Sequence, residues 1–109
     1  MAYDAATAER VRQSLSGLGD VAERKMMGAV CFMTRGHMFA GVMGEALMVR
    51  VGSDAYDAAL GEPHVRPMIM GTRRATGYVL VDPQGFASDA ALAGWLRRGL
   101  DFVAGLPEK

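Results

Sequence analysis

The residues of this 109-residue chain that could do chemistry are its methionines, its single cysteine and its two histidines. Six of the nine methionines lie between Lys25 and Val51, and four of these six are spaced five residues apart. Thioether and thiolate sulfurs are ligands that Cu(I) prefers, so the segment is a candidate soft-metal site. However, the chain contains no Met-x-x-Met pair and no His/Met cluster at ligand spacing. The sequence therefore favours methionine as adaptable apolar filler, and we expect no metal ion or other cofactor.

A nucleophilic thiol and a histidine base are the other chemical candidates. Cys31 lies in an apolar run, where a buried and unreactive thiol is expected. His37 is expected at the surface beside a turn, and His64 lies in the polar loop Glu62–Pro67. The chain has no GxGxxG or GxxxxGK[ST] phosphate-binding motif. We therefore expect no enzyme activity, and an enzyme with an unrecognised site is the last-ranked alternative.

The composition is that of one globular domain, residues 1–109, without an excess of charge. Half of the residues are hydrophobic, 22% are charged and the formal net charge is zero. Because nucleic-acid affinity depends on neutralising phosphates, this balance makes nucleic-acid binding a weak expectation. A single cysteine excludes an internal disulfide and any CxxC motif. Without an apolar leader or a run of about 20 apolar residues, a cytoplasmic protein that does not enter a membrane is expected.

Apolar periodicity and turn residues predict three helices and five strands. The helices are predicted over residues 4–18 and 54–61 and from Ser88 or Asp89 to about 105, with Gly99 as a point of close approach in the last. The strands are predicted over residues 26–34, 37–43, 46–51, 67–71 and 76–82. The order α-β-β-β-α-β-β-α predicts an α+β fold, a two-layer, five-stranded antiparallel sheet with three helices mainly on one face.

Two tight turns, at Arg35-Gly36 and Gly44-Glu45, are predicted to join the first three strands as hairpins. Directly opposed residues share a face of the sheet, so these turns determine which side chains lie beneath the helices. The face predicted beneath the helices carries Cys31, Met33, Met38, Ala40, Val42, Leu47, Val49 and Val51. The opposite face carries Val30, Phe32, Phe39, Met43, Met48 and Arg50. A slip of one residue in either turn would exchange the faces.

The second of these two sets is too apolar to face water. A single-layer antiparallel sheet usually has a polar outer face, and an exposed apolar patch is usually a binding surface. We therefore predict that this set is an interface. A second copy of the chain, giving a homodimer, is the expected partner, with an unidentified protein as the alternative. The predicted division of the four evenly spaced methionines between the two faces also argues against a metal site.

A small group of basic side chains suggests an alternative function. Arg66, Arg73 and Arg74 could form an anion-binding patch for nucleic acid or an acidic partner, with Arg73 and Arg74 at the end of a hairpin. Solvated turn residues are the simpler interpretation in a chain of zero net charge. A nucleic-acid-associated regulator that uses this patch is therefore kept as the alternative prediction.

Several motifs, in order, carry a family resemblance. They are Lys25-Met26-Met27-Gly28, Gly36-His37-Met38-Phe39 and Leu47-Met48-Val49-Arg50-Val51, followed by the segment from Arg66 to Pro83 and a helix with Trp95. Over about residues 9–107 the chain resembles the N-terminal domain of the TfoX/Sxy proteins, regulators of DNA uptake and natural competence. It departs from the family pattern at Met27, where Phe is usual, and around the predicted fourth strand.

This resemblance implies a stand-alone TfoX N-terminal-like domain. The implied fold is α+β, similar to the type III secretion chaperone arrangement, and the implied assembly is often a dimer. The implied role is regulatory, linked to competence or transcription. With no catalytic set in the sequence, we predict a non-catalytic regulatory or protein-interaction module.

Overall fold

The computed structural model describes residues 3–17, 20–26 and 28–107. Three α-helices, six β-strands and one short 3-10 helix form in these ranges. In chain order they are α1 (Ala5–Ser14), β1 (Ala22–Met26), β2 (Ala29–Thr34), β3 (His37–Met43), β4 (Ala46–Arg50), α2 (Ser53–Leu60), β5 (Val65–Met70), β6 (Arg73–Val81), η1 (Pro83–Phe86) and α3 (Asp89–Ala104).

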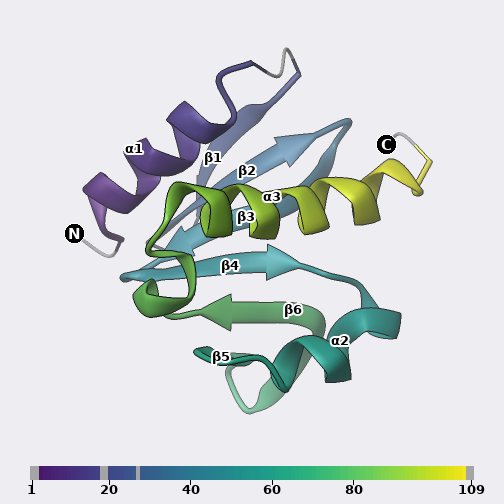
Figure 1. Cartoon of the computed structure of the whole chain (residues 1–109). Coiled ribbons are helices and arrows are strands. Elements are labelled where there is room, and N and C mark those ends of the chain that lie inside the picture. The colour runs from purple at the N-terminus through teal and green to yellow at the C-terminus, as the bar shows by residue number, and fades with distance from the viewer. Residues whose placement is uncertain (1–2, 18–19, 27, 108–109) are drawn as a thin grey trace.

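The strands form one antiparallel sheet in the spatial order β1-β2-β3-β4-β6-β5, and the helices pack on one of its faces (Figure 1). In this view α3 crosses in front of β3, and α2 lies beside β6. Val11 of α1, Ala59 of α2 and Leu96 of α3 all enter the same core. The predicted α+β arrangement with helices on one face is therefore confirmed.

Capping side chains begin two of the helices where the sequence predicts. The carboxylate of Asp4 accepts a hydrogen bond from the backbone N–H of Thr7 at 3.0 Å. The hydroxyl of Ser88 accepts one from the N–H of Ala91, also at 3.0 Å. Each satisfies a backbone donor that the first turn of a helix leaves free. The end of α1 differs from the prediction, because this helix ends at Ser14; Leu18, in the predicted helix, lies outside the described residues.

The prediction of five strands is wrong, because β1 is a sixth strand that the sequence pattern does not reveal. All five residues of β1, with the sequence AERKM, are exposed. An edge strand of this kind has no buried face, so it lacks the apolar alternation that marks a strand, and its charges discourage further strand pairing. Glu23 of β1 instead accepts a hydrogen bond from Arg12 of α1 at 2.8 Å. Met27, which falls in the predicted strand over residues 26–34, lies outside the described residues.

The register between β2 and β3 corrects the predicted faces. The turn at Arg35-Gly36 has two residues with positive φ (+55° and +83°), as a tight hairpin requires, and Met33 pairs with Met38 as the predicted register has it. Beyond that pair, however, the register shifts and Phe32 faces Ala40. Phe39 is therefore an extra residue in β3, a β-bulge, which exchanges the two faces of β2 relative to the rest of the sheet.

The bulge places three predicted interface residues in the core. Val30, Phe32 and Phe39 are buried beneath the helices. Cys31, Met33 and Met38, predicted beneath the helices, belong to the opposite face. From Ala40 onward the prediction is confirmed, because Ala40 faces Val49 and Val42 faces Leu47. The last five residues of the predicted helix-covered set all enter the core, namely Ala40, Val42, Leu47, Val49 and Val51.

Helix α3 crosses the sheet directly over this bulge. A Cβ atom added at Gly99 would lie 2.4 Å from the carbonyl oxygen of Phe39. No side chain fits there, so Gly99 is a point of close approach, as the sequence predicts.

The β2–β3 turn also holds the C-terminal end of α3. The guanidinium group of Arg35 donates to the carbonyls of Val103, Ala104 and Leu106 at 3.3, 3.3 and 3.0 Å. A cation at this position satisfies carbonyls that the helix leaves free and complements its dipole. Nε2 of His37 donates to the carbonyl of Pro107 at 2.7 Å. His37 is only 8% exposed, so its predicted place at the surface is wrong.

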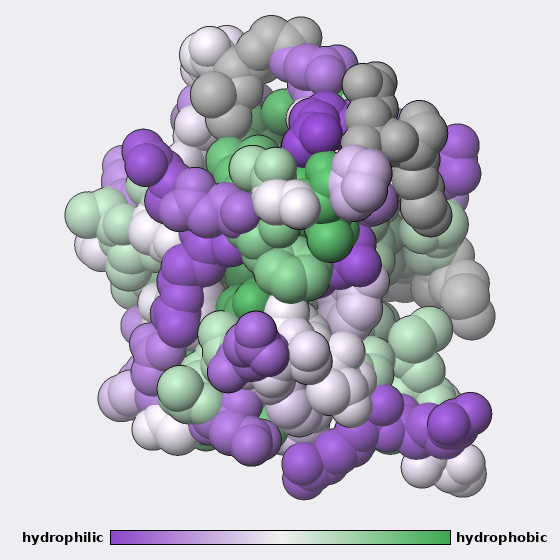
Figure 2. Space-filling view, turned by 90° about the vertical axis from the view of Figure 1, so that its right-hand side faces the viewer, coloured by the Kyte–Doolittle hydropathy of each residue, from purple (hydrophilic) through white to green (hydrophobic). Residues whose placement is uncertain are grey.

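Figure 2 shows the side of the molecule toward which the C-terminal end of α3 points. Hydrophilic residues there surround an apolar area in the upper half of the view.

We predict that Gly99→Ala lowers the free energy of unfolding by roughly 1–3 kcal/mol, because the new methyl group forces α3 away from Phe39. Urea denaturation measures the change. The matched control is Gly94→Ala in the same helix, where an added Cβ meets nothing within 4 Å. It should raise the free energy of unfolding by about 0.5–1 kcal/mol through helix propensity. Equal stabilisation by both variants would contradict the close contact at Gly99.

Candidate functional site

The helix-free face of the sheet carries a second apolar cluster, separate from the core beneath the helices. Strands β2 to β6 all contribute to it. Its buried members are Cys31, Ala46, Met48, Met68 and Leu80, with Met38, Met43, Ala75 and Tyr78 packed against them. An antiparallel sheet with helices on one side normally has a polar outer face. This cluster is therefore the first candidate for a binding surface.

A hollow of about 480 Å³ opens on this cluster, and we call it the methionine hollow. Six methionines and six other uncharged residues line it: Met26, Met38, Met43, Met48, Met68, Met70, Ala29, Cys31, Ile69, Gly71, Ala75 and Tyr78. Gly41 sets the position of Met48, since a Cβ added at Gly41 would lie 2.6 Å from the terminal methyl carbon of Met48. The side chain of Met48 therefore occupies the space that a Cβ at residue 41 would need.

The β5–β6 hairpin contributes one wall of the methionine hollow. The pairing of its strands shifts between Pro67 and Ile69, and Gly77 in β6 has a φ of +94°. Such irregularities bend strands. As a result Ile69 and Met70, near the hairpin turn, line the same hollow as Met26, which belongs to the opposite edge strand of the sheet.

The exposed large apolar side chains of the described residues are all found at this hollow. Met26 is 40% exposed, Ile69 51% and Met70 54%. Scattered exposed apolar residues are normal, but several gathered around one concave apolar surface indicate a binding site.

Two arginines flank the methionine hollow from its two sides. Arg24 in β1 pairs with Cys31, so it shares the face of the hollow, and it lies two residues from Met26. Arg73 in β6 pairs with Met70. Both arginines are exposed, and neither makes an ion pair with another described side chain. The hollow therefore combines an uncharged lining with cationic flanks.

The predicted interface residues lie in three different places. Val30, Phe32 and Phe39 are covered by the helices and cannot reach a partner. Met43 and Met48 line the methionine hollow. Arg50 lies at the end of β4, where its guanidinium carbon is 5.5 Å from the centre of the Tyr78 ring and 5.2 Å from that of Phe102.

Sequence reasoning missed the rim of the hollow. The sequence pattern places Met26, Ile69 and Met70 in strands and predicts no binding role for them. For Ile69 and Met70 a signal exists in the run Met68–Met70, which places three large apolar residues directly before a turn.

The predicted anion patch is not assembled. Arg73 and Arg74 lie at the end of the β5–β6 hairpin, as predicted. Arg66 lies four residues before Met70 in β5, roughly 13 Å away along the strand at about 3.3 Å per residue. It also donates to the carboxylate of Asp82 at 3.0 Å. Arg66 is therefore held by an acid at the far end of the hairpin.

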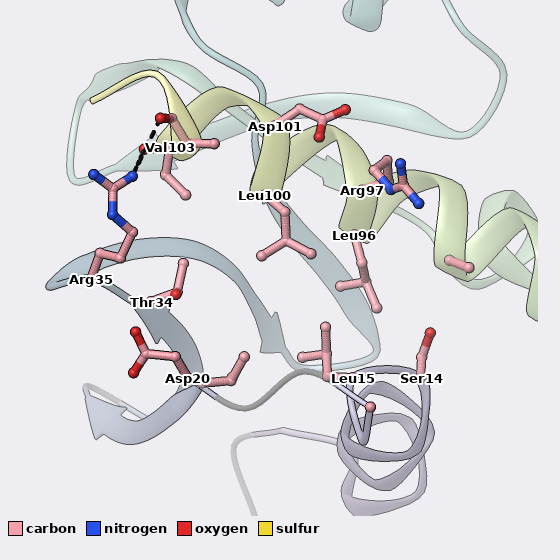
Figure 3. Close-up of a pocket in the computed structure, with 14 residues that line it drawn as sticks. Ser14, Leu15, Asp20, Thr34, Arg35, Leu96, Arg97, Leu100, Asp101 and Val103 are labelled. Carbon is pink, nitrogen blue, oxygen red and sulfur yellow. Dashed lines mark hydrogen bonds between the residues drawn. The ribbon is translucent and has the colours of Figure 1, made fainter. Parts of the chain in front are cut away.

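A second cavity, of about 680 Å³, lies between α1, β2 and α3. Figure 3 shows Leu15, Leu96 and Leu100 directed into it, whereas Arg97 and Asp101 point away. The guanidinium group of Arg35 donates a hydrogen bond to the carbonyl of Val103. Polar side chains also line this cavity, among them Asp20, Thr34 and Arg35, but among the described residues no hydrogen bond or ion pair joins two of the polar side chains of this lining.

Among residues 3–17, 20–26 and 28–107, no three His, Cys, Asp or Glu side chains are grouped so that they could hold a metal ion. The predicted division of the methionines is wrong, because Met38, Met43 and Met48 line the hollow with Cys31. Burial raises the pKa of the Cys31 thiol above its ordinary value, which disfavours the thiolate that a soft metal needs.

Within residues 3–17, 20–26 and 28–107, no helix is long and apolar enough to span a bilayer.

Comparison with known proteins gives one match. A family model described as the TfoX N-terminal domain matches residues 13–103. No curated protein and no solved structure matches the chain. The expected similarity to type III secretion chaperones therefore stays a prediction.

We predict that the thiol of Cys31 is unreactive in the folded protein. The side chain is 3% exposed, and burial raises its pKa above the ordinary value of a thiol. Alkylation by iodoacetamide near neutral pH, followed by mass spectrometry, should be about tenfold or more slower than in the denatured chain. In the folded protein the rate should rise over a higher pH range than in the denatured chain, because burial shifts formation of the thiolate to higher pH. Equal rates in the folded and denatured chains would contradict the burial.

Proposed function

Because the chain belongs to the TfoX N-terminal domain family, we propose that it is a non-catalytic, cytoplasmic regulatory module that acts by binding another protein through the methionine hollow. The observation that carries this proposal is that Met26, Ile69 and Met70, the exposed large apolar residues of the described chain, all line that hollow. Control of natural competence is the process that the family resemblance implies, and we include it in the proposal.

The anatomy of the hollow fits protein recognition. Protein interfaces combine an uncharged, well-packed centre with a polar rim, and arginine and methionine are enriched in them. Here the centre is uncharged, and Arg24 and Arg73 lie at its flanks. Methionine side chains also repack around different partners, which suits a surface that binds in a regulated way.

Nucleic-acid binding is the weaker alternative. Arg66 is paired with Asp82, and the lining of the hollow offers no charge to phosphates. Salt-dependent retention on DNA that is lost in Arg73→Ala/Arg74→Ala would support that alternative and count against our proposal.

The predicted homodimer is a second version of the same proposal, in which the hollows of two copies close on each other. A two-fold contact of this kind needs a self-complementary patch. The apolar lining meets that need, but Arg24 and Arg73 of both copies would then surround one contact without an acidic counterpart.

To test the role of the hollow, we predict that peptides selected from an unbiased display library against the wild-type protein bind at this face. Met70→Lys should weaken their binding about tenfold or more, because it places a charge at an apolar contact. Ala58→Lys is the matched control, since it adds the same charge to an exposed position on α2 and should leave binding unchanged.

The NMR signals of isotope-labelled methionine methyl groups report where these peptides bind. The signals of Met26, Met43 and Met70 should shift, while that of Met33, outside the lining, should move least. Peptides that bind without shifting these signals would overturn the proposal.

We further predict that self-association, if it uses the hollow, is lost in Met70→Lys and retained in Ala58→Lys. Sedimentation velocity at micromolar concentration measures it. A dimer with this pattern would assign the face to a second copy. A dimer that persists in Met70→Lys would place the contact between copies elsewhere.

A further inference from the structure

Two exposed arginines lie beside the methionine hollow. Arg24 flanks it on the side of β1, and Arg73 flanks it on the side of the β5–β6 hairpin. The residues that line the hollow carry no charge.

The acids on or next to β1 and β6, the strands of these two arginines, are already engaged or face away. Glu23, next to Arg24 in β1, pairs with Phe32 and therefore lies on the helix side, where Arg12 donates to it at 2.8 Å. Asp82, which follows β6, accepts from Arg66 at 3.0 Å. Neither acid is paired with Arg24 or Arg73. The helix-free face thus presents an apolar centre between two cations.

From this arrangement we infer that the occupant of the methionine hollow is an acidic amphipathic segment of a partner protein, most simply a helix. Its apolar side chains would enter the hollow, and its carboxylates would meet Arg24 and Arg73. This inference rests on the proposed function and names the chemistry of the partner.

The shape and composition of the hollow favour an acidic amphipathic segment over a bilayer surface, nucleic acid or a second copy of the chain. A hollow of about 480 Å³ receives a convex apolar ridge, such as the i, i+3/i+4, i+7 stripe of a helix, whereas a bilayer surface is flat. Nucleic acid would bring phosphates to an uncharged lining. A second copy of this chain would bring two further arginines. An acidic amphipathic segment satisfies both the apolar lining and the cationic flanks, since complementary potentials favour the correct partner.

Three synthetic peptides test the inference, each labelled for fluorescence anisotropy with the wild-type protein. The first is an amphipathic helix with leucines on one face and glutamates beside them, the second has lysines in place of the glutamates, and the third is a scrambled version of the first. The acidic amphipathic peptide should bind about tenfold or more tightly than the basic one, and the scrambled peptide should bind weakest. Added salt should reduce the preference.

Reversing the charges of Arg24 and Arg73 gives a second test of the inference. Arg24→Glu/Arg73→Glu should reverse the preference, so that the basic amphipathic peptide binds more tightly than the acidic one. Arg73→Glu alone should weaken the acidic peptide, and Arg97→Glu, the same change on the exposed surface of α3, should not. Such a reversal cannot come from a loss of folding, which would weaken every peptide alike.

The outcomes separate this inference from the proposed function. Peptides that shift the methyl signals of Met26, Met43 and Met70 without a preference for acidic sequence would overturn the partner class and leave the proposed function standing. A second copy or a DNA duplex that shifts the same signals would assign the hollow to that occupant and overturn the inference. If none of the peptides, selected or designed, shifts these signals, the proposed function itself fails.

Discussion

The contact between α3 and the bulge in β3 is the constraint on which the rest of the structure depends. Gly99 lets the backbone of α3 reach the carbonyl of Phe39, where an added Cβ would come within 2.4 Å. At that point β3 has one residue more than β2, and both Phe39 and Ala40 are buried beneath the helices. Arg35, in the turn of the same hairpin, fixes the end of α3 through three carbonyls. Helix, bulge and turn therefore hold one another in a single register.

That register determines which side chains lie on the helix-free face of the sheet. With the bulge, Phe32 lies under the helices, whereas Cys31 and Met38 belong to the helix-free face. Without it, aromatic rings would occupy the outer face and sulfur side chains the core. The bend of the β5–β6 hairpin then closes this sulfur-rich face into a hollow by bringing Met70 to it. The candidate site is thus a consequence of two local irregularities in the sheet, and its exposed apolar rim is what remains for a partner to cover.

The sequence predicts those parts of the fold that local chemistry dictates. Two helices begin where expected, at Asp4 and Ser88, Gly99 gives a close approach, and the β3–β4 register follows from a two-residue turn. Strand β1 could not be predicted, because an exposed edge strand leaves no apolar alternation. The bulge could not be predicted either, because β2 and β3 are apolar on both faces around Phe39. Either register buries a reasonable set of side chains, and only the fit of α3 against the bulge selects one.

The five-residue spacing of the methionines shows how the register selected by α3 changes which side chains line the hollow. Along a regular strand five steps are an odd number, so Met38 and Met43 would point to opposite faces. The extra residue at Phe39 restores the parity, and both side chains line the methionine hollow. Met33 pairs with Met38, and Met48 lies two residues beyond Ala46, the partner of Met43, so all four share the helix-free face. Three members of this series, Met38, Met43 and Met48, line the methionine hollow together. Because thioether side chains are flexible and uncharged, that lining can adapt to an apolar partner, while the arginines beside it determine the charge that the partner must carry.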